Sequence, residues 1–323
     1  MTLQHSSRLV SAAIALLLVA LALPRAVEAG WVWTPQTGWY NPARAVKSTA
    51  PELLEQADRA FAAEQYADAA HGYQLLLDSY PNAVEVDTAL VKLVEACFQL
   101  GEYDRSLEAI DRILARKPSA ETTTQVLLRK YEIAVSFLSG RKRSFFGISI
   151  GAEDYAIELL DKLVERFPFQ SYSDDALYHI GAYYLRESRW EEAEVVFQRV
   201  IKDYPQSEWS GIAEYQIGAS ALRRLKGVDY DFAPVNEAER RFVHYLQRHP
   251  AGEKAAAARD GLKEVNRLRA QRLYNIARHY ERQGAAKAVR YYLQKLLREH
   301  PETPIAPTAR ELLKKTGSAG DVE

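Results

Sequence analysis

The chain has 323 residues, enough for a large core or for several stacked units, and a formal net charge of −1. This near-neutral balance excludes a protein that binds nucleic acid or anionic membranes through its overall charge. Charged residues make up 26% of the chain, and Gly and Pro number 16 and 13, a composition typical of a soluble, helix-rich protein.

Residues 1–29 have the pattern of a secretory signal peptide. The apolar run 10–23 is too short to span a bilayer comfortably, and Val27 and Ala29 hold the small-residue positions before a cleavage site at Gly30. We therefore expect the mature chain to be exported to the periplasm. A retained signal anchor is the alternative.

The chain contains a single cysteine, Cys97, so no disulfide can form within one chain. Gly30 stands where a lipoprotein would carry its acylated cysteine, so the sequence predicts no anchor of that kind. The helical pattern around Cys97 indicates a small buried apolar residue, not a nucleophile.

Residues 30–50 form a Trp-rich arm in which Trp31, Trp33, Trp39 and Tyr40 stand among Gly and Pro. We interpret it as an arm whose aromatic side chains lie against the first repeat. A docking motif or a cell-wall contact is the alternative.

A repeat occupies most of the remaining chain. Prolines follow an aromatic, basic or His residue at Pro81, Pro118, Pro168, Pro205, Pro250 and Pro301. Three positions repeat before each proline. A small residue or valine stands 12 residues before it, a large residue 8 residues before it and an apolar residue 5 residues before it. The three series are Ala69, Ser106, Ala156, Ala193, Ala238 and Val289; Tyr73, Ile110, Leu160, Phe197, Phe242 and Leu293; and Leu76, Ile113, Leu163, Val200, Tyr245 and Leu296. Offsets of four and three place them on one helical stripe that ends at the proline.

This pattern predicts an all-α fold, a right-handed superhelix of about six tetratricopeptide-like helix hairpins with a C-terminal capping helix. The hairpins are expected at about 50–86, 87–122, 123–172, 173–210, 211–255 and 256–303. Insertions are expected at 139–152 and 227–234, a long helix near 253–283, the capping helix at 304–315 and a disordered tail at 317–323. The first two repeats, 51–122, precede the region 123–316.

Residues 173–210 match the tetratricopeptide repeat closely, because Gly181, Tyr184, Ala193, Phe197 and Pro205 fall at its spacing. The runs "FPFQSY", "DYPQSEW" and "HYERQGA…HPETP" further resemble BamD, the tetratricopeptide subunit of the machine that assembles outer-membrane β-barrels. The resemblance covers roughly residues 150–315. It implies a scaffold at the inner face of the outer membrane, with two partners: a barrel-assembly subunit that carries POTRA modules, and unfolded outer-membrane proteins.

The sequence lacks the motifs of common enzyme classes, such as HExxH, GxSxG, GxxxxGK[ST] and CxxC, and no two of the seven histidines form a metal-binding pair. The carboxylates Glu191, Glu192 and Glu194 follow a helix start, where they complement the helix dipole. We therefore expect no enzyme activity, no cofactor and no metal.

A repeated pair of tyrosine and arginine residues predicts a peptide-binding groove. Tyr178 and Arg186 recur 37 residues later as Tyr215 and Arg223, and a spacing of eight places each Tyr and Arg on a broad face of one helix. We expect a groove around these residues, Phe169 and Tyr172 to bind the C-terminal aromatic residue and carboxylate of an unfolded outer-membrane protein. The alternative is packed tyrosines beside solvated arginines.

A basic surface is expected near the C-terminus. Residues 254–298 hold twelve Lys or Arg and three Asp or Glu, a net charge of +9. Arg259, Lys263 and Arg267 form a stripe on one helix that could bind an acidic partner. The alternative is a solvated helix face. The basic and aromatic segment 141–146 could make peripheral contact with a membrane, and a plain exposed loop is its alternative.

Together these features favour a non-enzymatic periplasmic scaffold that resembles BamD and assists β-barrel assembly. The alternatives are a periplasmic adaptor for cell-wall assembly or polysaccharide export, and an enzyme or a regulatory subunit of one.

Overall fold

The computed structural model of the protein describes residues 32–34, 38–40, 48–145 and 148–318. The expected signal peptide and its cleavage site lie outside these residues. Of the Trp-rich arm, the structure describes the strands β1 (Val32–Thr34) and β2 (Gly38–Tyr40), which pair antiparallel. The contact that we expected between its aromatic side chains and the first repeat lies outside the described side chains.

The chain divides into two compact units, residues 1–113 and 114–323. In the first, α2 (Ala50–Ala62) and α3 (Tyr66–Ser79) form one hairpin, and α4 (Val86–Leu100) and α5 (Tyr103–Ala115) form the next. Cys97 is fully buried in α4, and burial raises the pKa of its thiol to about 11. Its expected role as a small apolar core residue is confirmed.

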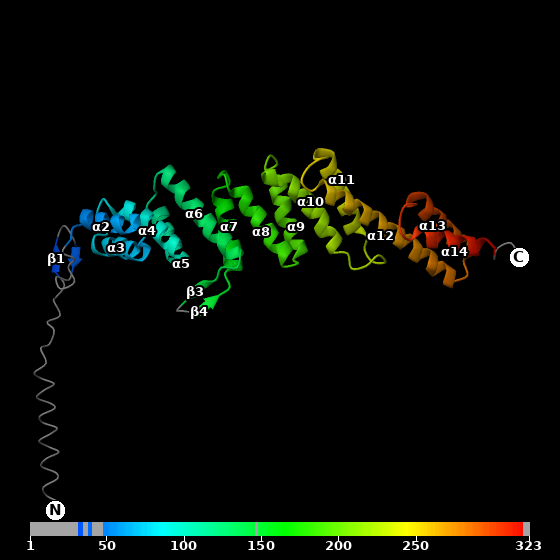
Figure 1. Cartoon of the computed structure of the whole chain (residues 1–323), viewed down its shortest axis with the longest axis horizontal. Helices are drawn as coiled ribbons and strands as arrows, with labels where there is room; N and C mark the ends of the chain where they lie inside the picture. Colours follow the sequence, from blue (N-terminus) through cyan, green and yellow to red (C-terminus); the bar gives the residue numbers. More distant parts are fainter. Residues whose placement is uncertain (1–31, 35–37, 41–47, 146–147, 319–323) are drawn as a thin grey trace, which may run out of the picture. The chain divides into compact units, whose positions relative to one another are not determined.

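The second unit holds four further hairpins and a final helix, which follow one another in chain order (Figure 1). The helices are α6 (Ala120–Leu138), α7 (Glu153–Arg166), α8 (Ser173–Arg186), α9 (Trp190–Asp203), α10 (Glu208–Arg223), α11 (Ala233–Arg248), α12 (Ala255–Arg282), α13 (Ala286–Glu299) and α14 (Ala306–Ser318). The predicted all-α fold of tetratricopeptide-like hairpins is confirmed.

The repeated stripe forms the core of the second helix in every hairpin. All eighteen residues of the three series are at most 4% exposed. The small residue of the stripe allows the neighbouring helix to approach, and the large residue fills the space between the two helices. At Gly181 in α8 a Cβ atom would lie 2.7 Å from the Phe197 ring of α9. The glycine is therefore required by the ring that packs on it.

The residues before the prolines end the helices in one shared conformation. Tyr80, Phe167, Tyr204, His249 and His300 have φ between −136° and −130° and ψ between 49° and 61°. A following proline disfavours the α-helical conformation at these five positions, so the chain leaves the five helices in the same conformation. Lys117, before Pro118, differs from them with a φ of 54°. The Tyr204 hydroxyl also donates a 2.9 Å hydrogen bond to the Pro168 carbonyl, which joins successive turns.

Some element bounds differ from those expected. The helix hairpins that we expected to begin at about 123 and 211 begin earlier, with α6 and α10. The reason is that Ser119 and Ser207 cap these helices by accepting hydrogen bonds from the backbone N–H groups of Thr122 and Trp209. The helix α14 continues through Ser318, beyond the expected start of the tail at 317, and the rest of the tail lies outside the described residues.

The insertion after α6 carries a β-hairpin that the sequence did not predict. Strands β3 (Arg143–Phe145) and β4 (Ile148–Ile150) pair antiparallel and project from the ends of α6 and α7 (Figure 1). The guanidinium of Arg143 lies 4.0 Å from the ring centre of Tyr155 in α7, a cation–π contact at the base of the hairpin.

The long helix α12 takes part in two cores. Ala258 and Val265 pack with α10 and α11, and Ala277 packs with α13 and α14. One continuous helix of 28 residues therefore joins the last hairpin to the hairpins before it. Within the described residues, no helix is both long enough and apolar enough to cross a bilayer.

We predict that Gly181→Ala lowers the free energy of unfolding by roughly 1–3 kcal/mol, because the added methyl group overlaps the Phe197 ring. Urea unfolding followed by circular dichroism measures the loss. Combining Gly181→Ala with Phe197→Leu provides the control, since the smaller side chain makes room for the methyl group. The double variant should then lose less than the sum of the two single losses, and strict additivity would contradict the proposed contact.

Candidate functional site

The first helices of three successive hairpins, α6, α8 and α10, lie next to one another in the second unit. Aromatic side chains connect them. Tyr131 of α6 stacks on Tyr172 at a centroid distance of 5.1 Å, and Tyr178 of α8 stacks on Trp209 of α10 at 3.8 Å and 14°. We call Tyr131, Tyr172, Tyr178, Trp209 and Tyr215 the aromatic face.

Trp209 is fixed at the centre of the aromatic face. Its indole N–H donates a short hydrogen bond to the Asp175 carboxylate of α8, while its ring covers Tyr178. Tyr215, one helical turn and a half further along α10, contacts the rings of Phe242 and Tyr245. Trp209, Tyr178 and Tyr215 are half-buried.

The predicted groove residues occupy several different environments. Phe169 is 97% exposed in the turn after α7, whereas Tyr172 is buried against Tyr131. Burial raises the pKa of Tyr172 to about 12, and its hydroxyl has no hydrogen-bond partner. Arg223 is exposed at the end of α10. Of the six residues, Tyr178 and Tyr215 are the two that lie half-buried and open on neighbouring first helices.

Arg186, expected on a cationic row beside the tyrosines, is exposed at the end of α8. The guanidinium of Arg186 donates a 2.7 Å hydrogen bond to the Leu138 carbonyl at the end of α6 and contacts Glu187 at 3.3 Å. Tyr178 instead turns toward α10 through its contact with Trp209. The two side chains therefore contact opposite neighbours of α8, and the eight-residue spacing did not reveal this.

Lys254 lies just before α12 and near the aromatic face, because its backbone bonds to Tyr245, whose ring contacts Tyr215; the sequence did not indicate it. The pKa of Lys254 is raised, chiefly by its hydrogen bond to Glu253 and less by the nearby hydroxyl groups of Tyr178 and Tyr215. Its backbone N–H donates a 2.9 Å hydrogen bond to the Tyr245 hydroxyl, which fixes the start of α12 against α11. Lys254 follows Tyr215 by 39 residues, so only the folded repeat brings the two together.

The predicted basic stripe lies exposed on α12, and local groups engage each of its cations. Lys263 contacts Asp260 at 2.8 Å, Arg267 contacts Glu264 through two bonds of 2.6 and 2.7 Å, and Arg259 donates to the Pro250 carbonyl at 2.6 Å. Two carboxylates therefore offset part of the charge of three cations. Exposed pairs of this kind contribute little stability, so a partner can still compete for these cations.

His179 lies between the stacked pairs of the aromatic face and close to both. Its ring is 6.1 Å from Tyr131 and 6.0 Å from Tyr178. Burial lowers the pKa of His179 below its ordinary value of 6.5, and the opposing charge of Asp175 is the smaller effect. The folded chain therefore favours the neutral imidazole.

Two comparisons with protein families identify the repeats. Residues 148–318 match YfiO, described as an outer membrane lipoprotein, and residues 54–121 match a tetratricopeptide repeat family. The chain belongs to the YfiO family. The first match spans more than half of the chain, and it confirms the resemblance to BamD, since YfiO is the BamD family. The two N-terminal hairpins lie outside the YfiO match.

Several solved structures are similar to the chain, and some of them are described as tetratricopeptide repeat proteins. A repeat protein from Parabacteroides merdae has 14% identity and a TM-score of 0.38 and covers 83% of this chain and 98% of its own. PilW, a type IV pilus biogenesis factor, has 16% identity and a TM-score of 0.29 and covers 81% and 99%. A protein from Thermus thermophilus has 15% identity and a TM-score of 0.31 and covers 66% and 99%. No curated protein matches the sequence.

We predict that His179 makes the fold sensitive to mild acid. Its pKa is lower in the folded chain than in the unfolded chain, so its contribution is fully present above about pH 6.5 and is lost as the pH falls from there through the lower pKa of the folded chain. The melting temperature should therefore fall more between pH 7.5 and pH 5.5 in the wild type than in His179→Gln. The exposed His71 gives the matched control, since the melting temperature of His71→Gln should fall as much as that of the wild type. Equal falls in all three proteins would contradict the prediction.

Proposed function

We propose that the protein is a non-enzymatic periplasmic scaffold that assists the assembly and insertion of β-barrel proteins into the outer membrane. The YfiO match over residues 148–318 is the observation that supports this most directly, because it covers all of the helices α7 to α14. Tetratricopeptide hairpins bind other polypeptides along their stacked helices, which supports a binding role rather than a catalytic one. We place the protein at the inner face of the outer membrane.

We further propose that the aromatic face binds the C-terminal segment of an unfolded outer-membrane protein. Such segments end in an aromatic residue and a free carboxylate. The half-buried rings of Tyr178, Trp209 and Tyr215 can stack with the aromatic residue. We assign the carboxylate to the ammonium of Lys254, which pairs with Glu253 at 2.6 Å in the free protein. Arg186 and Arg223 lie further along α8 and α10, where they can contact preceding residues of the peptide, and the exposed Phe169 can extend the apolar surface.

The C-terminal hairpin is the proposed docking site for the barrel-assembly subunit. Residues 254–298 carry a net charge of +9, and the exposed cations Arg259, Lys263 and Arg267 lie in a row on α12. An acidic surface on a POTRA module would complement this row and would speed association as well as orient the partner.

Peptide binding tests the first surface. A fluorescein-labelled decapeptide that ends in Phe with a free carboxylate should bind, and the same peptide with an amidated C-terminus should bind about tenfold more weakly, because it loses the charge on which Lys254 acts. Lys254→Gln should produce the same loss, and Tyr178→Ala with Arg186→Ala should abolish binding. Fluorescence anisotropy measures each affinity.

The control for this experiment is Tyr230→Ala, which removes a tyrosine that is 68% exposed on the loop between α10 and α11. It should leave the affinity unchanged. Circular dichroism melts show whether each variant remains folded. Unchanged affinity in the folded Lys254→Gln variant would contradict the assignment of the carboxylate site.

Recovery of partners from envelope extract tests the function as a whole. A barrel-assembly subunit with POTRA modules should copurify with the tagged protein, and the charge-reversal variant Arg259→Glu, Lys263→Glu, Arg267→Glu should lose it. Copurification with a cell-wall synthase or a polysaccharide exporter in its place would overturn the proposal and favour an adaptor role. The two N-terminal hairpins, which lie outside the YfiO match, are the feature that makes this alternative worth testing.

A further inference from the structure

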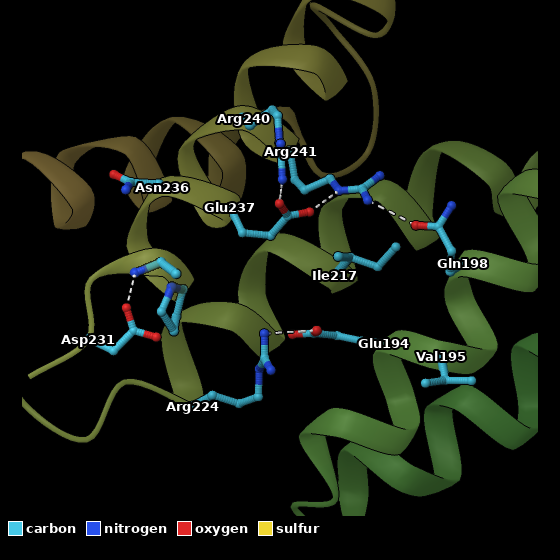
Figure 2. A pocket seen from close by; sticks show the side chains of 12 residues that line it. Glu194, Val195, Gln198, Ile217, Arg224, Asp231, Asn236, Glu237, Arg240 and Arg241 are labelled. Atoms are coloured by element: carbon cyan, nitrogen blue, oxygen red, sulfur yellow. Dashed lines mark hydrogen bonds and ion pairs between the residues drawn. The ribbon is translucent and has the colours of Figure 1, made fainter.

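A second open site lies on α9, α10 and α11, away from the residues of the aromatic face. It is a cleft of about 770 Å³ whose wall includes Glu194 of α9, Arg224 after α10, and Glu237 and Arg241 of α11 (Figure 2). The segment that connects α10 to α11 closes one side through Asp231. The inference drawn from it rests on the proposed role in binding polypeptides but concerns a different surface.

The cleft carries equal numbers of opposite charges, and most of them are satisfied within the protein. Arg241 donates to Glu237 at 2.6 Å, to Glu214 at 3.1 Å and to Gln198 at 2.9 Å. Glu237 also pairs with Arg240, as Figure 2 shows. The Asp231 carboxylate accepts a 2.9 Å hydrogen bond from the backbone N–H of Ala233. Because these charges cancel, neither an anion nor a cation gains a net attraction there.

Two polar atoms at the wall of the cleft remain without a partner. Glu194 and Arg224 form an ion pair of 3.0 Å between Oε2 and Nη2, with side chains that are 17% and 28% exposed. The second oxygen of the pair, Glu194 Oε1, accepts no hydrogen bond, and Arg224 Nε donates none, although both atoms are shielded from solvent. A native fold seldom leaves two such atoms unsatisfied in one pair, so each calls for an explanation.

An unused acceptor beside an unused donor is the complement of one residue of an extended chain. The N–H and C=O of such a residue point to the same side, so the N–H can donate to Glu194 Oε1 while the C=O accepts from Arg224 Nε. The terminal torsion of a glutamate is soft, so a modest rotation presents Oε1 to the cleft. Burial raises the pKa of Glu194, with the charge of Arg224 opposing it, so this carboxylate gains more from a new donor than an exposed one would.

We propose that this cleft binds an extended segment of a partner polypeptide through the main-chain N–H and C=O of one residue, with Glu194 and Arg224 as the recognition pair. The lining supports this occupant, because Val195, which lines the cleft, is 65% exposed. Such apolar surface beside a neutral polar pair suits a peptide, whose amide alternates with side chains. An Asn or Gln side chain offers the same amide chemistry.

The direct test observes the Arg224 Nε–H group by ¹H–¹⁵N NMR in the full-length chain. The probe is N-acetyl-trialanine N-methylamide, a capped peptide without charges or polar side chains. Its addition should shift the Arg224 Nε–H signal in a saturable way. Glu194→Gln should weaken binding about tenfold, because a neutral acceptor replaces a charged one. Asp203→Asn, which removes an exposed carboxylate at the end of the same helix, is the matched control and should bind as the wild type does.

The pH dependence gives a second readout. Glu191, Arg224 and Arg241 are the charged groups that act on Glu194, and an amide donor favours its ionised form. The affinity should therefore rise as the pH rises through the Glu194 pKa, and this dependence should vanish in Glu194→Gln. N-acetyl-asparagine methylamide separates a main-chain amide from a side-chain amide, since tighter binding than the alanine probe would assign the site to a carboxamide.

Three results would overturn the proposal. These are tighter binding of acetate or guanidinium than of the capped peptide, the absence of any shift at Arg224, and an unchanged affinity in folded Glu194→Gln. Failure here is separable from failure of the proposed function, because Tyr178→Ala should not alter binding in the cleft. Loss of C-terminal peptide binding with an intact response at Arg224 would count against the aromatic face alone.

Discussion

The structure depends on one packing constraint, the close approach of the two helices in a hairpin and of neighbouring hairpins within each compact unit. A short helix with one apolar stripe gains too little from its own hydrogen bonds to be stable in water, so its stability comes from the surface that a neighbour covers. The fully buried Phe197 against Gly181 shows this on a single pair of residues. The prolines also affect this packing, because they determine where each second helix ends and therefore where the next hairpin begins.

The sequence could predict this architecture because the constraint repeats. Ala193 and Phe197 stand at fixed distances before Pro205, and the same distances recur in all six hairpins, so helix type, pairing and core positions follow from counting. The β-hairpin after α6 could not be predicted in this way, because it occurs once and its residues have no repeat to compare with. The starts of α6 and α10 were placed about three residues late, since a single capping serine determines each of them.

The binding surfaces were harder to predict, since they depend on contacts between hairpins. Tyr178 and Tyr215 were found from their spacing, but their cation, Lys254, belongs to a later helix and shares no spacing with them. Arg186 was placed on a row beside the tyrosines from the same spacing, and that spacing does not reveal its hydrogen bond to the Leu138 carbonyl. The sequence indicated only a helix-dipole effect for Glu194, and its atom without a partner is found beside Arg224. The two surfaces that we propose as binding sites therefore differ in chemistry, one aromatic and cationic and one neutral and polar.

Hydrogen–deuterium exchange of Phe197→Ala, compared with the wild type, tests the central claim that each hairpin is stabilised by its neighbours. The substitution removes the side chain that α8 and α9 share, so exchange should become faster in α8, α9 and the adjoining α10, while α2 and α3 in the first unit should exchange as before. Faster exchange confined to α9, with α8 and α10 as protected as in the wild type, would contradict the account.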